Sequence, residues 1–273
     1  MSTPDFESPP VVEVALSVQF NELPRWEAAH LGLLWVEEFK SRLPTTATHP
    51  PLGRQVETFG LSPASGVKFE FHDGPPTPRA WFLDPSETQL VQVQADRFVH
   101  NWRKTDDDDT YPRYETIRER FSDDITSLLQ FIERHDLGDL KPDQCEITYV
   151  NHITLPWDDA GHRDMDRVFT FVRDPNTRTF LPNPESIDAT AHFVITSGEP
   201  KLPIGRLHAS VRAGFQNNDS TPIFVFTLTA RGLPAGDGVD GILSFLDVGR
   251  EWIVRGFVDL TTEEMHKVWG RRQ

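Results

Sequence analysis

Alternation of hydrophobic and polar residues is the clearest signal at the start of the chain. Between residues 12 and 20 every second residue is apolar, and the residues between them are polar or small. This period of two is typical of a strand with one buried face. The same reasoning predicts shorter strands near residues 55–60, 67–72 and 79–84, which Gly, Pro and Asp separate, and a longer strand over residues 89–102.

Apolar residues at helical spacing predict two long helices. The first covers about residues 112–135 and the second about residues 238–257, and in each the apolar side chains form one stripe. A shorter helix is predicted over about residues 24–43. Thr261 and Glu264 have the spacing of a capping box, which begins a short helix near the end of the sequence.

The order of elements in the first part of the chain is repeated in the second. Strands near residues 146–155, 189–197, 206–215 and 222–231 precede the second long helix, and residues 162–173 fit either a short helix or a strand. Because short turns join successive strands, we expect antiparallel sheets with helices on one face, the α+β class. We predict a leader at residues 1–10 and two similar halves, residues 11–140 and 141–273, each a helix-backed antiparallel sheet. The alternative is a single curved sheet that grips the last long helix and encloses a cavity.

Composition narrows the class of function. The chain has 273 residues with 42 acidic and 27 basic side chains, and its net charge is -15. Such a chain repels phosphate backbones and anionic lipid, which disfavours a nucleic-acid or membrane-surface role. No apolar run approaches the ~20 residues of a membrane helix, and the first ten residues lack the pattern of a signal peptide. With a single cysteine, the sequence predicts a cytoplasmic protein without disulfides.

A glycine-rich segment, Gly236 to Gly241, matches the dinucleotide fingerprint G-x-G-x-x-G. A Rossmann unit needs a second parallel strand after the helix, whereas the helix predicted here is followed only by another helix. Asp237 and Asp240 would also place negative charge where a pyrophosphate binds. We therefore interpret this segment as a turn and predict no cofactor.

The other motifs in the sequence give little support for metal binding or catalysis. Acidic residues and one histidine cluster between residues 158 and 166, but their spacing does not match a calcium loop, and no metal site is predicted. The sequence has no metalloprotease histidine pair and no nucleophile elbow. Cys145 is expected to be a small core residue. We predict no catalytic residue, and the alternative is a hydrolase or transferase whose site is assembled between the two halves.

Several short blocks resemble a sporadically distributed bacterial family of uncharacterised proteins of about this length. They are residues 9–14 with 19–20, residues 92–98 with Asn101 and Trp102, residues 149–153, and the closing Phe257, Thr261, Glu264, Trp269 and Gly270. The resemblance carries no catalytic residue with it. The patchy occurrence of the family implies an accessory system, such as a phage-defence or toxin–antitoxin component.

Two strand faces carry polar side chains in alternation. Gln92, Gln94, Asp96 and His100 share a parity on the strand predicted over residues 89–102, and Arg206, His208 and Arg212 share one on the strand 206–215. These positions either form the solvated side of an antiparallel sheet or receive a partner protein, a peptide or an anionic ligand. Arg97, Asn101 and Trp102 are candidates to frame this surface, because arginine and aromatic residues favour binding centres.

The sequence thus favours a protein-interaction or regulatory module that acts through a sheet face. The six candidate residues for binding a partner protein are Arg97, Asn101, Trp102, Arg206, His208 and Arg212. A nucleic-acid partner is the least favoured reading because of the negative charge of the chain.

Overall fold

The computed structural model describes residues 3–60, 78–157, 160–172, 179–182, 184–198, 201–216 and 220–272. Nine strands of the described chain form one antiparallel sheet in the order β3-β4-β5-β6-β2-β7-β10-β9-β8. The strands are β2 (Val11–Phe20), β3 (Thr45–His49), β4 (Arg79–Leu83), β5 (Gln89–Gln94), β6 (Arg97–Arg103), β7 (Pro142–Thr154), β8 (Ala189–Thr196), β9 (Pro203–Phe215) and β10 (Pro222–Gly232). The strand predicted at 67–72 lies outside the described residues.

The antiparallel pair β2–β7 forms the centre of the sheet and joins the two halves of the chain. Within this sheet the first strand of each half also pairs with the last, β2 with β6 and β7 with β10. The expectation of two separate sheets is therefore wrong, and the single sheet of the alternative is correct. An unpaired edge strand leaves its backbone groups available for another strand, and β2 and β7 satisfy each other in this way. The division of the chain at residue 140 stays a prediction.

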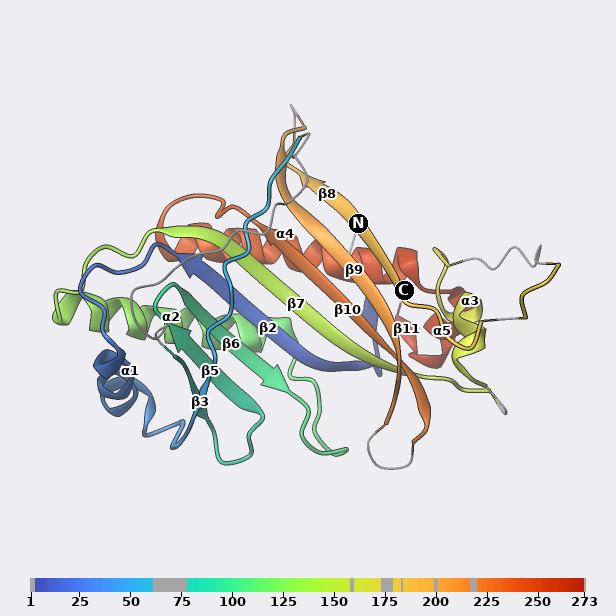
Figure 1. Ribbon diagram of the computed structural model, residues 1–273, viewed down its shortest axis with the longest axis horizontal. Helices are drawn as coiled ribbons and strands as arrows, with labels where there is room; N and C mark the ends of the chain where they lie inside the picture. Colours follow the sequence, from blue (N-terminus) through green and yellow to red (C-terminus); the bar gives the residue numbers. More distant parts are fainter. Residues whose placement is uncertain are drawn as a thin grey trace.

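The helices cover one face of this sheet (Figure 1). α2 (Tyr114–Arg134) packs on β6, and α4 (Gly238–Leu260) packs on β7, β9 and β10 and also contacts α2. Both are the predicted long helices, and their buried stripes include Ile117, Phe121, Ile125, Phe245, Leu246 and Ile253. The sheet thus carries two long helices and does not grip only the last one. None of the helices in the described ranges has the length and apolarity to cross a membrane.

Smaller helical elements lie on the same side. α1 (Ala28–Leu34) continues into a π-helical turn, Trp35–Phe39, and the ring of Phe39 lies 5.6 Å from that of Phe82. The segment predicted as a short helix or strand is a 3-10 turn, His162–Asp164, followed by α3 (Met165–Val168). The next residue, Phe169, packs on Phe224 and Phe226 of β10.

The two ends of the described chain lie together. β1 (Asp5–Phe6) pairs with β11 (Arg271–Arg272), and the Phe6 ring contacts Phe257 and Trp269. α5 (Glu263–Val268) precedes β11 and begins one residue later than the sequence predicts, because Thr262 and not Thr261 accepts the cap hydrogen bond. The predicted leader is thus anchored to the last elements of the chain.

Residues 89–102 form a hairpin and not the single strand that the alternation predicts. Ala95 and Asp96 make the turn between β5 and β6, and Gln94 pairs with Arg97. The turn changes the parity of the side chains, so that His100 faces the helices. A turn of this composition has neither Gly nor Asn to mark it in the sequence.

Candidate functional site

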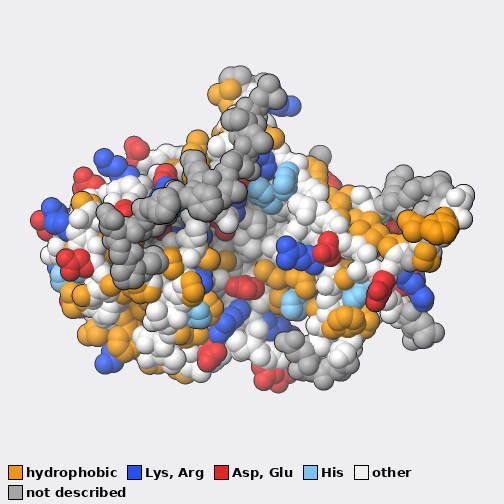
Figure 2. Space-filling view, in the orientation of Figure 1, with side chains coloured by type: hydrophobic (Ala, Val, Ile, Leu, Met, Phe, Trp, Pro, Cys, Tyr) orange, Lys and Arg blue, Asp and Glu red, His pale blue; other side chains and the backbone are white. Residues whose placement is uncertain are grey.

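The sheet face opposite the helices, which we call the open face, is crossed by residues 50–60. We call this segment the strap. It follows β3, and Figure 1 shows it as the light-blue trace in front of β6, β2 and β7. Residues 55–60 were predicted as a strand, but in the structure they do not belong to one. Figure 2 views this face and shows charged side chains and histidines scattered among hydrophobic and other side chains.

Three glutamine side chains from three strands hold the backbone of the strap. Gln94 accepts a hydrogen bond from the Leu52 nitrogen at 2.9 Å and donates to the Leu52 carbonyl at 3.0 Å. Gln19 makes the same two bonds to residue 55, at 2.9 and 2.7 Å. Gln144 accepts from the backbone nitrogen of Glu57 at 3.1 Å. A side-chain amide carries both a donor and an acceptor, so this arrangement binds a peptide backbone without reading its sequence.

Arginine side chains add further bonds to the strap backbone. Arg97 is 6 % exposed and donates to the carbonyl of Gly53 at 2.9 Å and to Gln19 at 2.7 Å. Arg206 donates to the carbonyl of Thr58 at 3.1 Å. The strap also donates in return, because its own Arg54 reaches the carbonyl of Phe20 at 2.8 Å.

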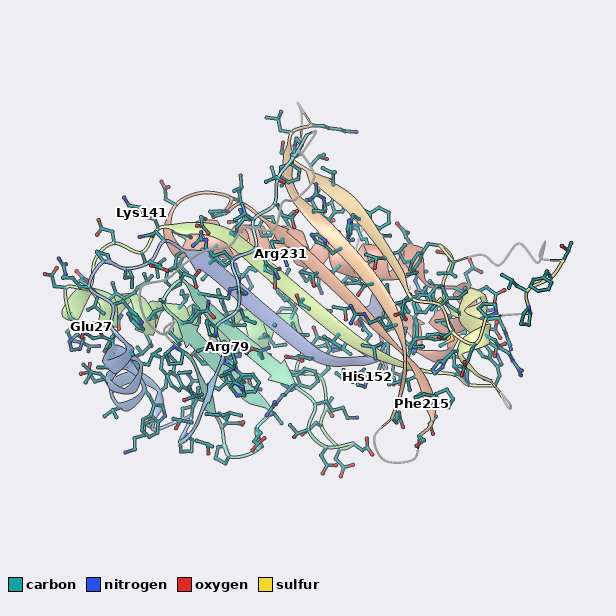
Figure 3. All side chains as sticks on the ribbon, in the orientation of Figure 1. Glu27, Arg79, Lys141, His152, Phe215 and Arg231 are labelled. Atoms are coloured by element: carbon teal, nitrogen blue, oxygen red, sulfur yellow. The ribbon has the colours of Figure 1, made fainter. Side chains whose placement is uncertain are left out.

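One acidic side chain of the strap enters a cluster of cations. The Glu57 carboxylate is 4 % exposed and pairs with Arg206, His208 and Arg231, the last at 3.2 Å. Arg231 also binds Glu146 of the neighbouring strand β7 at 2.5 Å. Figure 3 labels Arg231 and Arg79, which lie on the two halves of the sheet.

The electrostatics of Glu57 favour its charged form. Burial by itself would raise the pKa of this carboxyl group, but the hydrogen bond and charge of His208 and the charges of Arg231 and Arg206 together lower it below its ordinary value. A carboxylate that is buried and still ionised needs such partners. The cluster is therefore a site for one carboxylate.

The structure brings together three of the six residues that the sequence singled out. Arg206 and His208 bind Glu57, and Arg97 binds the strap at Gly53. Arg212 is on the same strand as Arg206 but is exposed. Asn101 also lies on the open face, where it binds Gln92 at 2.8 Å and Glu13 at 2.6 Å.

The sixth residue, Trp102, does not frame the open face. It is 3 % exposed and packs on Tyr111 on the side of the helices, with ring centroids 5.5 Å apart. His100 lies on that side as well, where its Nδ1 is 2.7 Å from Asp124. His100 was placed on the binding surface because the hairpin turn at Ala95 and Asp96 was not recognised. Trp102 was named because aromatic residues favour binding centres.

Sequence reasoning missed the strap and its acidic residue. Glu57 lies 149 to 174 residues from its three cationic partners, so no local pattern links them. Gln19, Gln144 and Arg231 were also missed as site residues, although each alternates with apolar or small residues along its strand. Their parity was the available signal, because it places all three side chains on the open face.

The other candidate motifs have structural roles. Gly241 has no room for a side chain, since a Cβ there would lie 2.0 Å from the carbonyl oxygen of Gly236. The glycines therefore allow a tight turn between β10 and α4. Burial raises the pKa of the Cys145 thiol to about 12. Within the described ranges no group of three His, Cys, Asp or Glu residues could hold a metal ion, and Asp158 and Asp159 lie outside those ranges.

No family model and no curated protein matches this sequence. The resemblance of its short blocks to a bacterial family stays a prediction.

Proposed function

We propose that this protein is a protein-interaction module whose open face binds an extended, acidic segment of a partner protein. One observation carries the proposal: the strap, an extended segment with one buried glutamate, occupies this face through its backbone and its carboxylate. The strap thus acts as the chain's own occupant of a peptide site, and the partner segment takes its place.

The contacts favour a peptide over a nucleic acid. The side chains of Gln19 and Gln94 each bracket the N–H and the C=O of one residue, and a nucleic-acid backbone has no N–H group to offer. The cation cluster is sized for one carboxylate, and Arg231 already shares Glu146. A phosphate backbone would instead need a continuous row of cations, in a chain whose net charge is -15.

Exchange of the strap is possible because it is held by hydrogen bonds and ion pairs. Val56 and Leu52 of the strap are 57 % and 38 % exposed, so little apolar area is buried with them. A tethered segment competes at a high effective concentration, in the millimolar range for short linkers. A partner segment must therefore bind more tightly than the strap or bind when the strap is weakened.

The test uses the full chain with the substitution Glu57→Arg, which places a fourth cation in the cluster and expels the strap. A fluorescent peptide with the sequence of residues 50–60 is titrated and its anisotropy is measured. The variant should bind this peptide at least about tenfold more tightly than the wild-type protein, because the wild-type site is already occupied. A second substitution, Arg231→Gln, should weaken binding of the peptide to the variant.

The matched control is Val56→Arg, which introduces the same arginine side chain at an exposed position of the strap and should leave the site closed. A folded Glu57→Arg variant that does not bind the peptide would contradict the proposal. So would equal binding of a peptide whose Glu57 is replaced by Arg. Binding of single-stranded DNA in preference to the peptide, with an affinity that falls steeply with salt, would point to the nucleic-acid class instead.

A further inference from the structure

A pocket of about 350 Å³ lies on the other side of the sheet, between the sheet, α2, α4 and the leader. Tyr149 and Leu228 form its floor on β7 and β10. Residues 250–257 of α4 form one wall, and residues 3–6 and 9–11 of the leader form another. The volume is at the lower end of the range for small-molecule sites, and none of the strap residues lines it.

One arginine of this pocket has unused hydrogen-bonding capacity. The Nε of Arg250 is buried and makes no hydrogen bond, and Glu115 approaches its guanidinium only to 3.9 Å. The other two arginines of the lining, Arg113 and Arg272, pair with Asp5 at 3.0 and 3.4 Å. Arg250 therefore contributes positive charge to the pocket without a close carboxylate partner.

A pair of tyrosines lies beside this arginine. The hydroxyl groups of Tyr111 and Tyr149 are 2.9 Å apart, and one hydrogen atom is enough to bond them. The second hydrogen atom remains available to an acceptor in the pocket. Burial raises the pKa of Tyr149 to about 12 and also raises that of Tyr111, so both groups keep their hydrogen atoms at neutral pH.

The remaining lining combines apolar and polar side chains. The polar ones include Asp5, Glu115 and Asn151. The apolar ones are Phe6, Val11, Leu228, Ile253, Val254 and Phe257. An apolar part beside convergent polar groups is the usual composition of a small-molecule site.

We propose that this pocket binds a small monocarboxylate with an aromatic or branched aliphatic body. The carboxylate pairs with Arg250 and accepts a hydrogen bond from the tyrosine pair, and the body fills the apolar part. A neutral apolar ligand would leave Arg250 with only the more distant carboxylate of Glu115 in a drier site, which is costly. A dianion such as a phosphate ester would need a second cation, and Arg113 and Arg272 are held by Asp5.

The experiment is isothermal titration calorimetry of the full chain at pH 7 with three carboxylates, 3-phenylpropionate, indole-3-acetate and 4-methylpentanoate. Each is compared with its neutral amide. At least one acid should bind, and its amide should bind about tenfold to a hundredfold more weakly, because a charge-assisted bond to Arg250 is lost. Arg250→Gln should weaken the acid by a similar factor and leave the amide nearly unchanged.

The matched control is Arg255→Gln, on the same helix, where the side chain pairs with Glu251 at 2.8 Å and does not line the pocket. It should leave the affinity for the acid unchanged. Tyr149→Phe gives a second test of the site, with an expected loss of about threefold to tenfold for the acid. Failure of all three acids to bind at millimolar concentration would overturn the proposal, as would equal affinity for acid and amide. Neither result bears on the open face, because the two sites lie on opposite sides of the sheet.

Discussion

Replacement of Glu57 is the sharpest test of what holds the strap on the open face. Glu57→Gln preserves the size of the side chain and removes its charge, so it affects the ion pairs with Arg206, His208 and Arg231 and little else. The backbone bonds of the strap to the three glutamines are left in place. The variant therefore measures how much the charge of the carboxylate contributes to holding the strap on the sheet.

The loss of stability depends on how well other carboxylates or water compensate the three cations once the charge of Glu57 is removed. Breaking a buried ion pair costs about 3–5 kcal/mol when the remaining charge is uncompensated. Here Arg231 keeps Glu146, and Arg206 is 24 % exposed and can be hydrated. The expected loss is therefore nearer to that of a single hydrogen bond to a charged group, about 1.5–3 kcal/mol. If the strap detaches before the sheet unfolds, the loss cannot exceed the free energy that holds the strap on the sheet.

Hydrogen exchange read by mass spectrometry measures the strap directly. The amides of Leu52, Gln55 and Glu57 are bonded to glutamine side chains, and in Glu57→Gln they should exchange about tenfold to a hundredfold faster. The control is Val56→Ala, an exposed position of the strap, which should leave their exchange unchanged. Unchanged exchange in Glu57→Gln would refute the view that the cation cluster holds the strap.

For the same variant we expect the loss of stability to depend on pH in a definite direction. Because the pKa of Glu57 is lowered in the folded protein from an ordinary value of 4.5, its contribution to stability is complete above pH 4.5 and is lost as the pH falls through the lowered value. The difference in free energy of unfolding between wild type and Glu57→Gln, measured by urea melts, should shrink as the pH falls below 4.5. A difference that grows as the pH falls below 4.5 would contradict the assignment.

Three further predictions concern other residues of the protein. Leu246→Ala should lower the free energy of unfolding by about 2–5 kcal/mol in urea melts, because Leu246 is fully buried in α4. Arg206→Gln should cost about 1–2 kcal/mol through its loss of Glu57, whereas Arg212→Gln, at an exposed position, should stay within about 0.5 kcal/mol. Cys145, buried and with a thiol pKa of about 12, should react with a thiol reagent at pH 8 only after the protein unfolds.

The elements of this fold were largely visible in the sequence, and their assembly was not. The period-two pattern of β2 and the helical stripes of α2 and α4 depend on burial of one face, which any sequence with that burial must show. The pairing of β2 with β7 depends on backbone groups that every residue carries. No side-chain pattern therefore distinguishes one sheet of nine strands from two smaller sheets.

The residues of the candidate site were likewise predictable only in part. Arg206 and His208 could be placed on the open face, because parity along a single strand is a local property. The hairpin turn at Ala95 and Asp96 changes the parity of the strand that follows it, and His100 was thus assigned to the wrong side. Glu57 could not be assigned at all, because it reaches its partners by crossing the sheet between strands that are distant in the sequence.

The pairing of β1 with β11 has a consequence for the order of events in folding. It joins Asp5 to Arg272 and so closes a longer loop than any strand pair of the main sheet. Because the entropy of loop closure grows with the number of residues enclosed, we expect this pair to form late and to open early. β1 and β11 form a sheet of their own, apart from the nine-strand sheet. Opening of this pair would therefore give a ligand access to the pocket that the leader walls off, while the strands of the nine-strand sheet stay paired.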